Sequence, residues 1–259
     1  MTKAAHNRRR DRTSWDPLAA WYDGWMGQQG SIHHRQLAIP ALLDLLRPQS
    51  GERILDIGAG QGVLAPYLAR DGVHYTGVEI SPRLLKIARS RHGQHGVFIQ
   101  ADATKLAAVP ELRNRQFDAA VFLLSIQDMQ PLDAVLRSTS RLLVAGGRVV
   151  ILMTHPCFRV PRQSGWGWDE NRKLAYRRVD RYLTPLPVPM KTYPGQTGVT
   201  LSFHRPLSIY INTLAANGLL IEQVREIAAD NIDQPSVNVD HLARAEIPLF
   251  LGLRARKVQ

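Results

Sequence analysis

The chain has 259 residues, 44% of them hydrophobic and 21% charged, so it is long enough to bury the core of one large domain. Its apolar runs are too short to cross a bilayer, and its basic N-terminus lacks the apolar stretch of a secretory signal. The single cysteine excludes an internal disulfide and a cysteine-cluster zinc site, so we expect a cytoplasmic protein.

The net charge of +11 makes RNA or another anionic partner an alternative to be tested. Residues 1–12 carry five Lys and Arg against one acid, and residues 159–191 carry eight against three. Runs of like charge are more often solvated surfaces than binding sites. We therefore expect residues 1–14 to be a disordered basic tail, and an RNA-binding role for it stays open.

In chain order, segments 16–27 and 33–48 predict two helices, the second interrupted at Pro40, which together form a helical cover over residues 15–50. From residue 51, strands and helices alternate, as is typical of a parallel α/β sheet. The expected strands are 53–58, 74–80, 96–102, 117–125 and 146–153, and the expected helices are 62–72, 81–92 and 131–143. These elements form a predicted core over residues 51–153.

The alternation stops at residue 154, and segment 154–204 is rich in Pro, Arg, Trp and Tyr. Within it, residues 177–183 resemble an exposed strand and residues 197–206 resemble its return strand, which predicts a small antiparallel lid. A helix at 205–220, a strand at 220–227, a polar linker and a strand at 246–258 then complete the sheet over residues 205–259.

The strongest local signal is ILDIGAGQG, residues 54–62, in which a buried strand runs into a glycine-rich loop and then a helix. Glycines let the backbone approach a ligand closely. The spacing differs from the G-x-G-x-x-G of dinucleotide sites, and Asp56 is a poor neighbour for a pyrophosphate. Asp56, Glu79 and Asp102 end three successive strands, at the edge where open α/β sheets bind ligands. Helix caps and loop acids are the alternative for each of them.

The motifs LDIGAGQG, GVEIS, QADAT and FDAAVFLLSIQD resemble those of the class I S-adenosylmethionine-dependent methyltransferases, in particular the small-molecule, ubiquinone-biosynthesis-like group. The resemblance covers residues 50–155 well and 205–258 more loosely. It implies a Rossmann-like α/β fold with a seven-stranded, mostly parallel sheet and helices on both faces. An N-terminal helical cover and a small antiparallel lid after the fifth strand complete this expected architecture.

The resemblance also implies where S-adenosylmethionine binds. The glycine loop would lie against its methionine part, Glu79 would hold the ribose, and Ile80 would pack on the adenine. The segment WYDGW resembles a helix that closes over the cofactor. The implied cofactor-binding residues are Tyr22, Arg35, Asp56, Gly58, Ala59, Gly60, Glu79, Ile80, Asp102, Ala103, Leu124 and Ser125.

Methyl transfer from a sulfonium is mainly a matter of alignment, and it needs a base only when the acceptor arrives protonated. His155 directly follows the fifth strand and suits a general base, although orienting the next loop is an equally good interpretation. His204 and Asp128 are the other candidates, and the histidines show no metal-ligand spacing. Cys157 lacks the sequence context of a covalent nucleophile.

The tryptophans occur only in the N-terminal segment and in 154–204, where they would line an acceptor site or simply fasten these segments to the sheet. Arg177, Arg178 and Arg181 would favour an anionic acceptor, or else protect an edge strand from aggregation. The candidate substrate-binding residues are Trp25, Trp166, Trp168, Arg181 and Tyr182.

The sequence thus predicts an enzyme that moves a methyl group to an O, N or C atom of a small molecule. An RNA methyltransferase is the alternative suggested by the basic charge, although Ser125-Ile126-Gln127-Asp128 departs from the motif of enzymes that methylate exocyclic base amines. A cofactor-binding protein without transfer activity is the alternative from another functional class.

Overall fold

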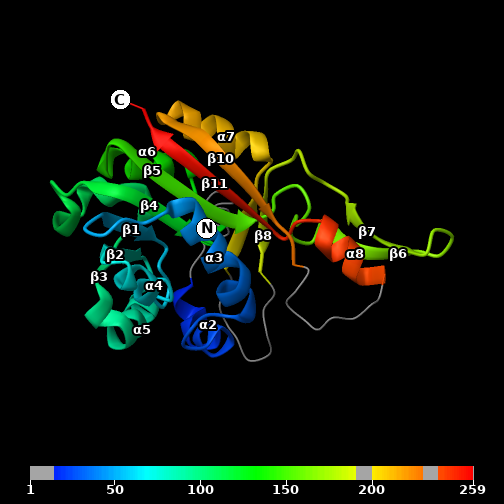
Figure 1. Ribbon diagram of the computed structural model, residues 1–259, viewed down its shortest axis with the longest axis horizontal. Helices are drawn as coiled ribbons and strands as arrows, with labels where there is room; N and C mark the ends of the chain where they lie inside the picture. Colours follow the sequence, from blue (N-terminus) through cyan, green and yellow to red (C-terminus); the bar gives the residue numbers. More distant parts are fainter. Residues whose placement is uncertain (1–14, 191–199, 230–238, 259) are drawn as a thin grey trace, which may run out of the picture.

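The computed structural model describes residues 15–190, 200–229 and 239–258, so the predicted tail lies outside the described residues. A seven-stranded sheet in the order β10-β11-β5-β4-β1-β2-β3 forms its centre (Figure 1). Its strands are β1 Arg53–Ile57, β2 His74–Glu79, β3 Val97–Gln100, β4 Phe117–Leu123, β5 Leu143–Thr154, β10 Leu219–Ile227 and β11 Phe250–Lys257. Strand β11 is antiparallel to both of its neighbours, whereas β1 to β5 pair in parallel. The predicted Rossmann-like, seven-stranded and mostly parallel sheet is confirmed, and its last strand in the chain is the reversed one.

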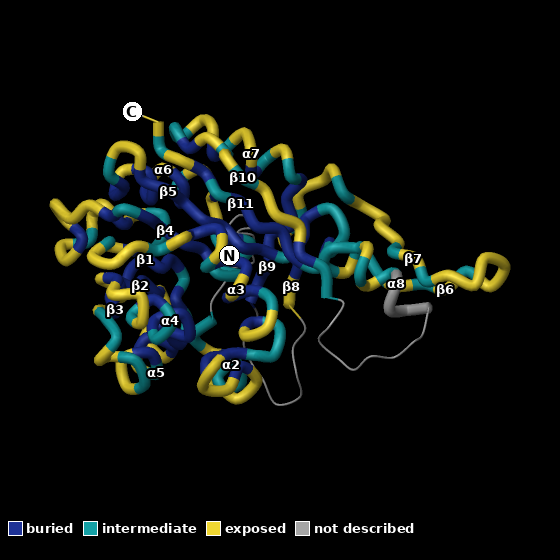
Figure 2. The backbone as a smooth tube through the Cα atoms, in the orientation of Figure 1, coloured by how far each residue is buried: buried dark blue, intermediate teal, exposed yellow. Residues whose placement is uncertain are grey.

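Helices cover both faces of this sheet because its strands are apolar on both sides. Successive side chains of a strand point to opposite faces, so Ile54 packs into one core and Leu55 into the other. One face carries α3 Ile39–Leu46, α4 Ala65–Arg70 and α5 Pro82–His92, and the other carries α6 Leu132–Leu142 and α7 Leu207–Ala216. Figure 2 shows the buried residues concentrated along the strands and the inner helix surfaces.

The N-terminal cover consists of the 3-10 turn Asp16–Leu18 (η1), helix α2 Ala19–Met26 and a π-helical segment His34–Ala38 that leads into α3. The expected interruption of the helix is the π-helical segment, which lies just before Pro40. Pro40 itself lies in the first turn of α3, where a proline removes no helical hydrogen bond. Asp23 of α2 binds both terminal guanidinium nitrogens of Arg91 on α5. The cover is therefore attached to the helix that follows β2.

The inserted segment after β5 is antiparallel, as predicted, but its strands pair differently. It forms two hairpins, β6 Ser164–Asp169 with β7 Leu174–Val179, and β8 Leu186–Pro189 with β9 Leu201–His204. The predicted strands of the lid therefore pair with separate partners that the prediction missed. Gly and Trp alternate in β6 and two prolines occupy β8, so neither segment has the composition of an ordinary strand.

The β6–β7 hairpin extends away from the sheet, and α8, Val239–Glu246, lies beside it in place of part of the predicted linker (Figure 1). In the part of the chain that the structure describes, no helix is both long and apolar enough to span a bilayer.

Candidate functional site

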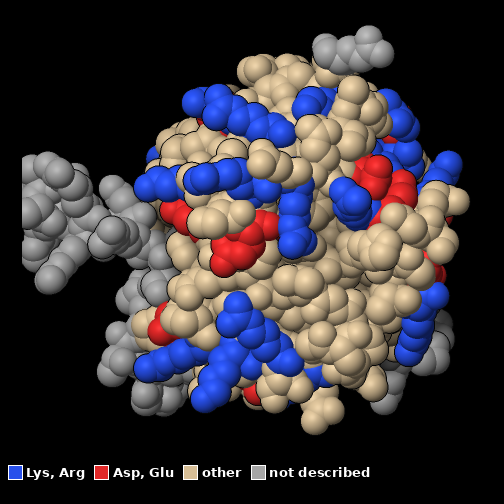
Figure 3. All heavy atoms as spheres, turned by 90° about the vertical axis from the view of Figure 1, so that its left-hand side faces the viewer, with Lys and Arg blue, Asp and Glu red and all other residues tan. Residues whose placement is uncertain are grey.

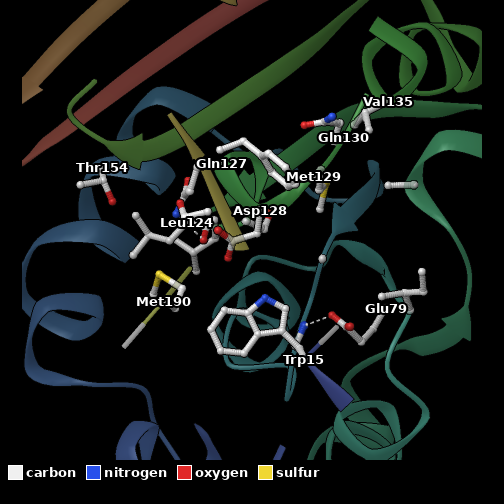
Figure 4. A pocket seen from close by; sticks show the side chains of 18 of the residues that line it. Trp15, Glu79, Leu124, Gln127, Asp128, Met129, Gln130, Val135, Thr154 and Met190 are labelled. Carbon is white, nitrogen blue, oxygen red and sulfur yellow. Dashed lines mark hydrogen bonds between the residues drawn. The ribbon is translucent and has the colours of Figure 1, made fainter. Parts of the chain in front are cut away.

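A cavity of about 1030 Å³ lies at the carboxyl ends of the parallel strands. The loops after β1, β2, β3 and β4 form one side of it, with Gly58, Glu79, Asp102 and Leu124 among the lining residues. The N-terminal cover and parts of the 154–204 insertion form the remaining walls. Figure 4 shows Trp15 of the cover facing the loop that follows β4. A cavity of this volume accommodates a nucleoside-sized cofactor together with a second small molecule.

The glycine loop is held in a conformation that other residues rarely adopt. Gly58 has a φ of +74° and Gly60 a φ of +55°, both in the left-handed region. A Cβ atom on Gly58 would lie 2.7 Å from both Ser125 Cβ and Met129 Cε. The amide of Gly58 donates to the carbonyl of Val78 on β2, at 2.9 Å. The chain therefore needs glycine at this position both for its backbone angle and for space.

Glu79 ends β2 inside the cavity, and backbone amides hold both of its oxygens. Its Oε2 accepts from Gly60 N and its Oε1 from Ser81 N, each at 2.9 Å (the first bond is dashed in Figure 4). Burial raises the pKa of Glu79, while these amide donors lower it. The carboxylate is thus fixed in place with lone pairs left over to accept hydrogen bonds from a ligand.

Two neighbours of Glu79 fit the flat, amine-bearing adenine ring of a nucleoside. Ile80 lines the cavity with 56% of its surface exposed, which is unusual for an isoleucine next to a buried strand. Asp102, after β3, caps the following 3-10 turn by accepting from Thr104 N through Oδ1. An apolar platform beside a carboxyl group is the arrangement that the sequence motifs imply for adenine.

Asp56 lies beneath the glycine loop and outside the cavity lining, only 2% exposed. Its Oδ2 accepts from the hydroxyl of Tyr75 at 2.8 Å, whereas Oδ1 is buried without a hydrogen-bond partner. Burial raises the pKa of Asp56 to about 7; the Tyr75 bond lowers it and Glu79 raises it further. Asp56 is therefore a buried group bonded to Tyr75 of β2, and it does not face the cavity.

Strained backbone marks the end of β4. Leu124 has a φ of +52°, in the left-handed region, and its carbonyl accepts from Gln127 Nε2 at 2.8 Å. The next residue, Ser125, donates from Oγ to the carbonyl of Ile57 at 2.6 Å. Such a conformation persists where surrounding contacts fix it, and it often accompanies a binding site.

Asp128 is the carboxyl group in this loop with the most unusual environment. It lines the cavity, and Figure 4 shows the Trp15 indole directed toward it. Burial raises the pKa of Asp128 to about 7, although hydrogen bonds from Ser202 and Trp15 and the charge of Arg205 lower it. A carboxyl group with a pKa near neutrality is suited to accept a proton at physiological pH.

Comparisons with known proteins agree with this geometry. Residues 55–151 match the family model described as "Methyltransferase domain". The chain is 32% identical over 142 residues to a ubiquinone biosynthesis O-methyltransferase of Xylella fastidiosa (strain 9a5c), covering 52% of this chain and 56% of that protein. It is 32% identical over 117 residues to a demethylmenaquinone methyltransferase of Tropheryma whipplei (strain Twist), covering 45% and 48%. The matches thus span about half of each relative.

A solved structure extends the likeness to nearly the whole chain. The crystal structure of an S-adenosylmethionine-dependent methyltransferase from Mesorhizobium loti superposes with a TM-score of 0.69 at 26% identity, covering 89% of this chain and 100% of that one. Residues 55–151 are thus a methyltransferase domain, and the fold of nearly the whole chain is similar to that of an S-adenosylmethionine-dependent methyltransferase. S-adenosylmethionine is the cofactor of this family, and the glycine loop, the fixed Glu79 and the exposed Ile80 fit it.

The methyltransferase cavity contains most of the residues predicted to bind the cofactor. Arg35 is outside the lining, because its guanidinium donates to the carbonyl of Gly30 at 2.5 Å and its side chain is exposed. Ala59 and Asp56 lie behind the loop instead of facing the cavity. The predicted residues that line it are Tyr22, Gly58, Gly60, Glu79, Ile80, Asp102, Ala103, Leu124 and Ser125.

His155 is not brought to the cavity, although Thr154 and Pro156 on either side of it are. Its Nε2 contacts Glu226 Oε1 at 2.9 Å, and its Nδ1 accepts from the amide of Cys157 at 3.2 Å. Burial lowers the pKa of His155, and Glu226 partly offsets this. Both ring nitrogens are therefore engaged, which favours a role in orienting the loop over a role as a base.

His204 does line the cavity, next to Ser202. Its Nε2 lies 2.6 Å from the carbonyl of Tyr182, and a carbonyl can only accept, so this nitrogen carries the proton. Nδ1 is then the nitrogen with a free lone pair. The structure thus keeps His204 and Asp128, both in the cavity wall, as candidate bases.

The predicted substrate residues separate into two groups. Trp25 lines the cavity, whereas Trp166, Trp168 and Arg181 do not. Tyr182 also lies outside the lining: its hydroxyl accepts from Leu207 N at 2.9 Å and its carbonyl binds His204, so it fastens the insertion to α7. In the insertion, the residues that line the cavity come from its two ends, around Pro156 and Phe203, and from Met190.

Sequence reasoning missed several cavity residues, because no motif contains them. His34 is buried, and burial together with His33 lowers its pKa to about 4. Arg205 is buried and donates to the carbonyl of Met129 at 2.6 Å. Gly30, four residues before His34, lies tightly against the Cβ of His34. This contact exists only in the folded chain, so it could not be recognised from the sequence.

Proposed function

We propose that the protein transfers the methyl group of S-adenosylmethionine to an oxygen atom of a small-molecule acceptor, with Asp128 as the general base. The observation that carries this proposal is the position of Asp128, in the wall of the same cavity as Glu79 and with a pKa raised to about 7. The name of the Xylella relative, an O-methyltransferase of ubiquinone biosynthesis, supports oxygen as the acceptor atom.

When bound, S-adenosylmethionine supplies a methyl group that is already activated as a sulfonium. The glycine loop and Glu79 would hold its nucleoside part at one end of the cavity. Transfer to a hydroxyl forms a carbon–oxygen bond, breaks a carbon–sulfur bond and releases the hydroxyl proton. Asp128 would accept that proton, which makes the attacking oxygen more nucleophilic. The surrounding walls would exclude water and align the two reactants.

The walls of the cavity favour a small acceptor over a nucleic acid. The cover contributes Trp15, Tyr22 and Trp25, and the insertion contributes Ser202 and Phe203, so aromatic side chains surround the space opposite the sheet. Figure 3 shows patches of Lys and Arg on one face of the molecule, with acidic and uncharged residues among them. Some of the exposed arginines are paired with acids, such as Arg256 with Glu222.

Transfer can be tested with radiolabelled S-adenosylmethionine, the full chain, and two sets of acceptors: mono- and dihydroxybenzenes, and total RNA. We expect label in a phenolic product and none above background in RNA. Calorimetry with S-adenosylhomocysteine measures cofactor binding separately. Label found only in RNA would overturn the small-molecule proposal, and an absence of cofactor binding would overturn the whole function.

A further inference from the structure

Arg159 is the cation that the insertion contributes to the cavity wall, just after β5. It shares that part of the lining with Pro156, Pro161, Met190 and Phe250, which are largely apolar. None of these residues comes from the loops after β1, β2 and β3, which carry the residues that fit the nucleoside. This region is therefore the part of the cavity left for the acceptor.

The guanidinium of Arg159 has only neutral partners among the described residues. Its Nε and Nη2 donate to the carbonyls of Pro248 and Ile247, at 3.3 and 3.5 Å. Both bonds are long, so they satisfy a cation only weakly. Among the residues whose side chains the structure describes, which leaves out 230–242, no Asp or Glu oxygen lies within ion-pair distance of Arg159.

Further positive charge surrounds Arg159. The guanidinium carbons of Arg159 and Arg177 each lie 5.3 Å from the centre of the Trp166 ring. Arg177 is held in place by donating to Phe158 O at 2.8 Å and to Ser164 Oγ at 2.9 Å. Burial, then Arg177 and Arg244, lower the pKa of Arg159 to about 10. Arg159 and Arg177 thus share one partly buried location on Trp166, and the exposed Arg244 adds positive charge to it.

Such a group of cations stabilises a bound anion. A partly buried guanidinium without a carboxylate loses hydration and gains little in return. An oxyanion at the cavity wall would receive charge-assisted hydrogen bonds from the planar guanidinium and would relieve the repulsion among the three arginines.

We propose that Arg159 binds a carboxylate on the acceptor, whose apolar or aromatic body fills the adjoining part of the cavity. This inference rests on the proposed function, and it changes which residues would recognise a negative charge. Arg178 pairs with Asp180 at 2.9 Å, and Arg181 is exposed outside the lining. Arg177 acts through Trp166 and the loop that carries Arg159, so it is a positioning residue.

The test compares two ligands that differ in charge and hardly in shape, 2-naphthoate and 2-naphthamide. Each is titrated by calorimetry into the full chain saturated with S-adenosylhomocysteine, with tryptophan fluorescence as a second readout because Trp166 adjoins Arg159. We expect the wild type to bind the acid about tenfold more tightly than the amide, as for one charge-assisted hydrogen-bonded pair. Arg159→Gln should abolish that preference, and Arg159→Lys should keep part of it.

Arg172→Gln is the matched control, because it removes the same charge from an exposed residue of the hairpin. It should bind both ligands as the wild type does. Equal affinity for acid and amide in the wild type, binding of neither, or a preference that survives in Arg159→Gln would overturn the inference. Binding of S-adenosylhomocysteine, measured first in every variant, separates these outcomes from misfolding and from failure of the proposed function.

Discussion

Arg205 and Asp128 line the same cavity, yet Nη2 of Arg205 donates a hydrogen bond to the carbonyl of Met129, at 2.6 Å, instead of to the carboxylate of Asp128. Its positive charge therefore acts on Asp128 through space. That charge lowers the pKa of Asp128 against the larger effect of burial, and the pKa settles at about 7. A close ion pair would have kept Asp128 ionised and weakly basic, so this spacing keeps the group able to accept a proton near neutral pH.

Asp128→Asn should lower kcat by about 100-fold or more, because an amide cannot accept the acceptor proton. Affinity for S-adenosylhomocysteine should change little, since Asn preserves the shape of the side chain. Steady-state kinetics and calorimetry measure the two effects. Asp133→Asn, an exposed residue nearby on α6, controls for the lost charge. A kcat close to that of the wild type would exclude Asp128 as the base.

The pH dependence of kcat/KM should follow the ionisation of Asp128. The carboxyl group is active when deprotonated, so kcat/KM should rise with pH and level off above its pKa of about 7. This rise should disappear from the residual activity of Asp128→Asn. The measurement is a profile from pH 5.5 to about 9 in buffers of constant ionic strength. A flat profile for the wild type would contradict the assignment.

Gly58→Ala should lose cofactor binding, because the new Cβ would lie 2.7 Å from Ser125 Cβ and Met129 Cε on a backbone with a φ of +74°. We expect a fall in S-adenosylhomocysteine affinity of about tenfold or more, with a lower melting temperature. Gly93→Ala is the control, since a Cβ there meets nothing within 4 Å. Normal affinity in Gly58→Ala would show that the loop does not contact the cofactor.

Glu79→Gln should also weaken binding, for a different reason. Each carboxylate oxygen accepts from a backbone amide, Gly60 N or Ser81 N, and the amide nitrogen of Gln cannot replace either. The loss should be about tenfold or more in affinity for S-adenosylhomocysteine. Adenosine, which keeps the ribose hydroxyls, should show a similar loss by calorimetry. An unchanged affinity for both ligands would remove Glu79 from the site.

Asp56→Asn should alter how stability depends on pH. The unfolded carboxyl has a pKa of about 3.9, and burial raises the pKa in the folded protein to about 7. The folded state therefore holds a proton that the unfolded state releases, and this contribution to stability, complete below pH 4, is lost as the pH rises through 7.

Without cofactor, the melting temperature of the wild type should consequently fall from pH 5 to pH 8 by more than that of Asp56→Asn. Each kcal/mol corresponds to about 2–4 °C in a protein of this size. Asp71→Asn, an exposed residue on the same face, corrects for the change in net charge. Parallel curves for wild type and Asp56→Asn would show that the carboxyl ionises normally.

The parts of the fold that follow from local sequence were predictable. Apolar strands bounded by glycines gave five parallel strands in chain order, and Ser81 does cap α5 by accepting from Leu84 N. The hairpins of the insertion were not predictable, because β6 and β8 lack a strand-like composition and their pairing depends on contacts made only after folding. Helix α8 was missed for a similar reason: it is short, and polar residues precede it in the sequence.

The candidate site also contains residues that the local sequence predicts and residues that only the folded chain brings together. Glu79 and Asp102 belong to motifs that immediately follow strands, so their place at the cavity is encoded locally. Arg205 reaches the loop after β4 from 76 residues away, and only the folded chain brings it there. His155 misled for a related reason: it directly follows β5 as predicted, but its ring binds Glu226 of β10, two strands away in the sheet, and lies outside the cavity lining.

The attachment of the cover to α5 bears on the speed of the whole catalytic cycle. Asp16 accepts from Ser81 Oγ at 2.8 Å, and Asp23 binds Arg91. Two carboxylates of the cover thus attach it to α5 and to the N-cap of α5, and the same segment brings Trp15 and Tyr22 to the cavity. Departure of the spent cofactor past this segment would break both attachments. Ion pairs at a surface weaken as salt screens them. If that departure limits turnover, kcat should rise with ionic strength. The contacts between the cover and α5, distant from the reacting atoms, would then set the rate.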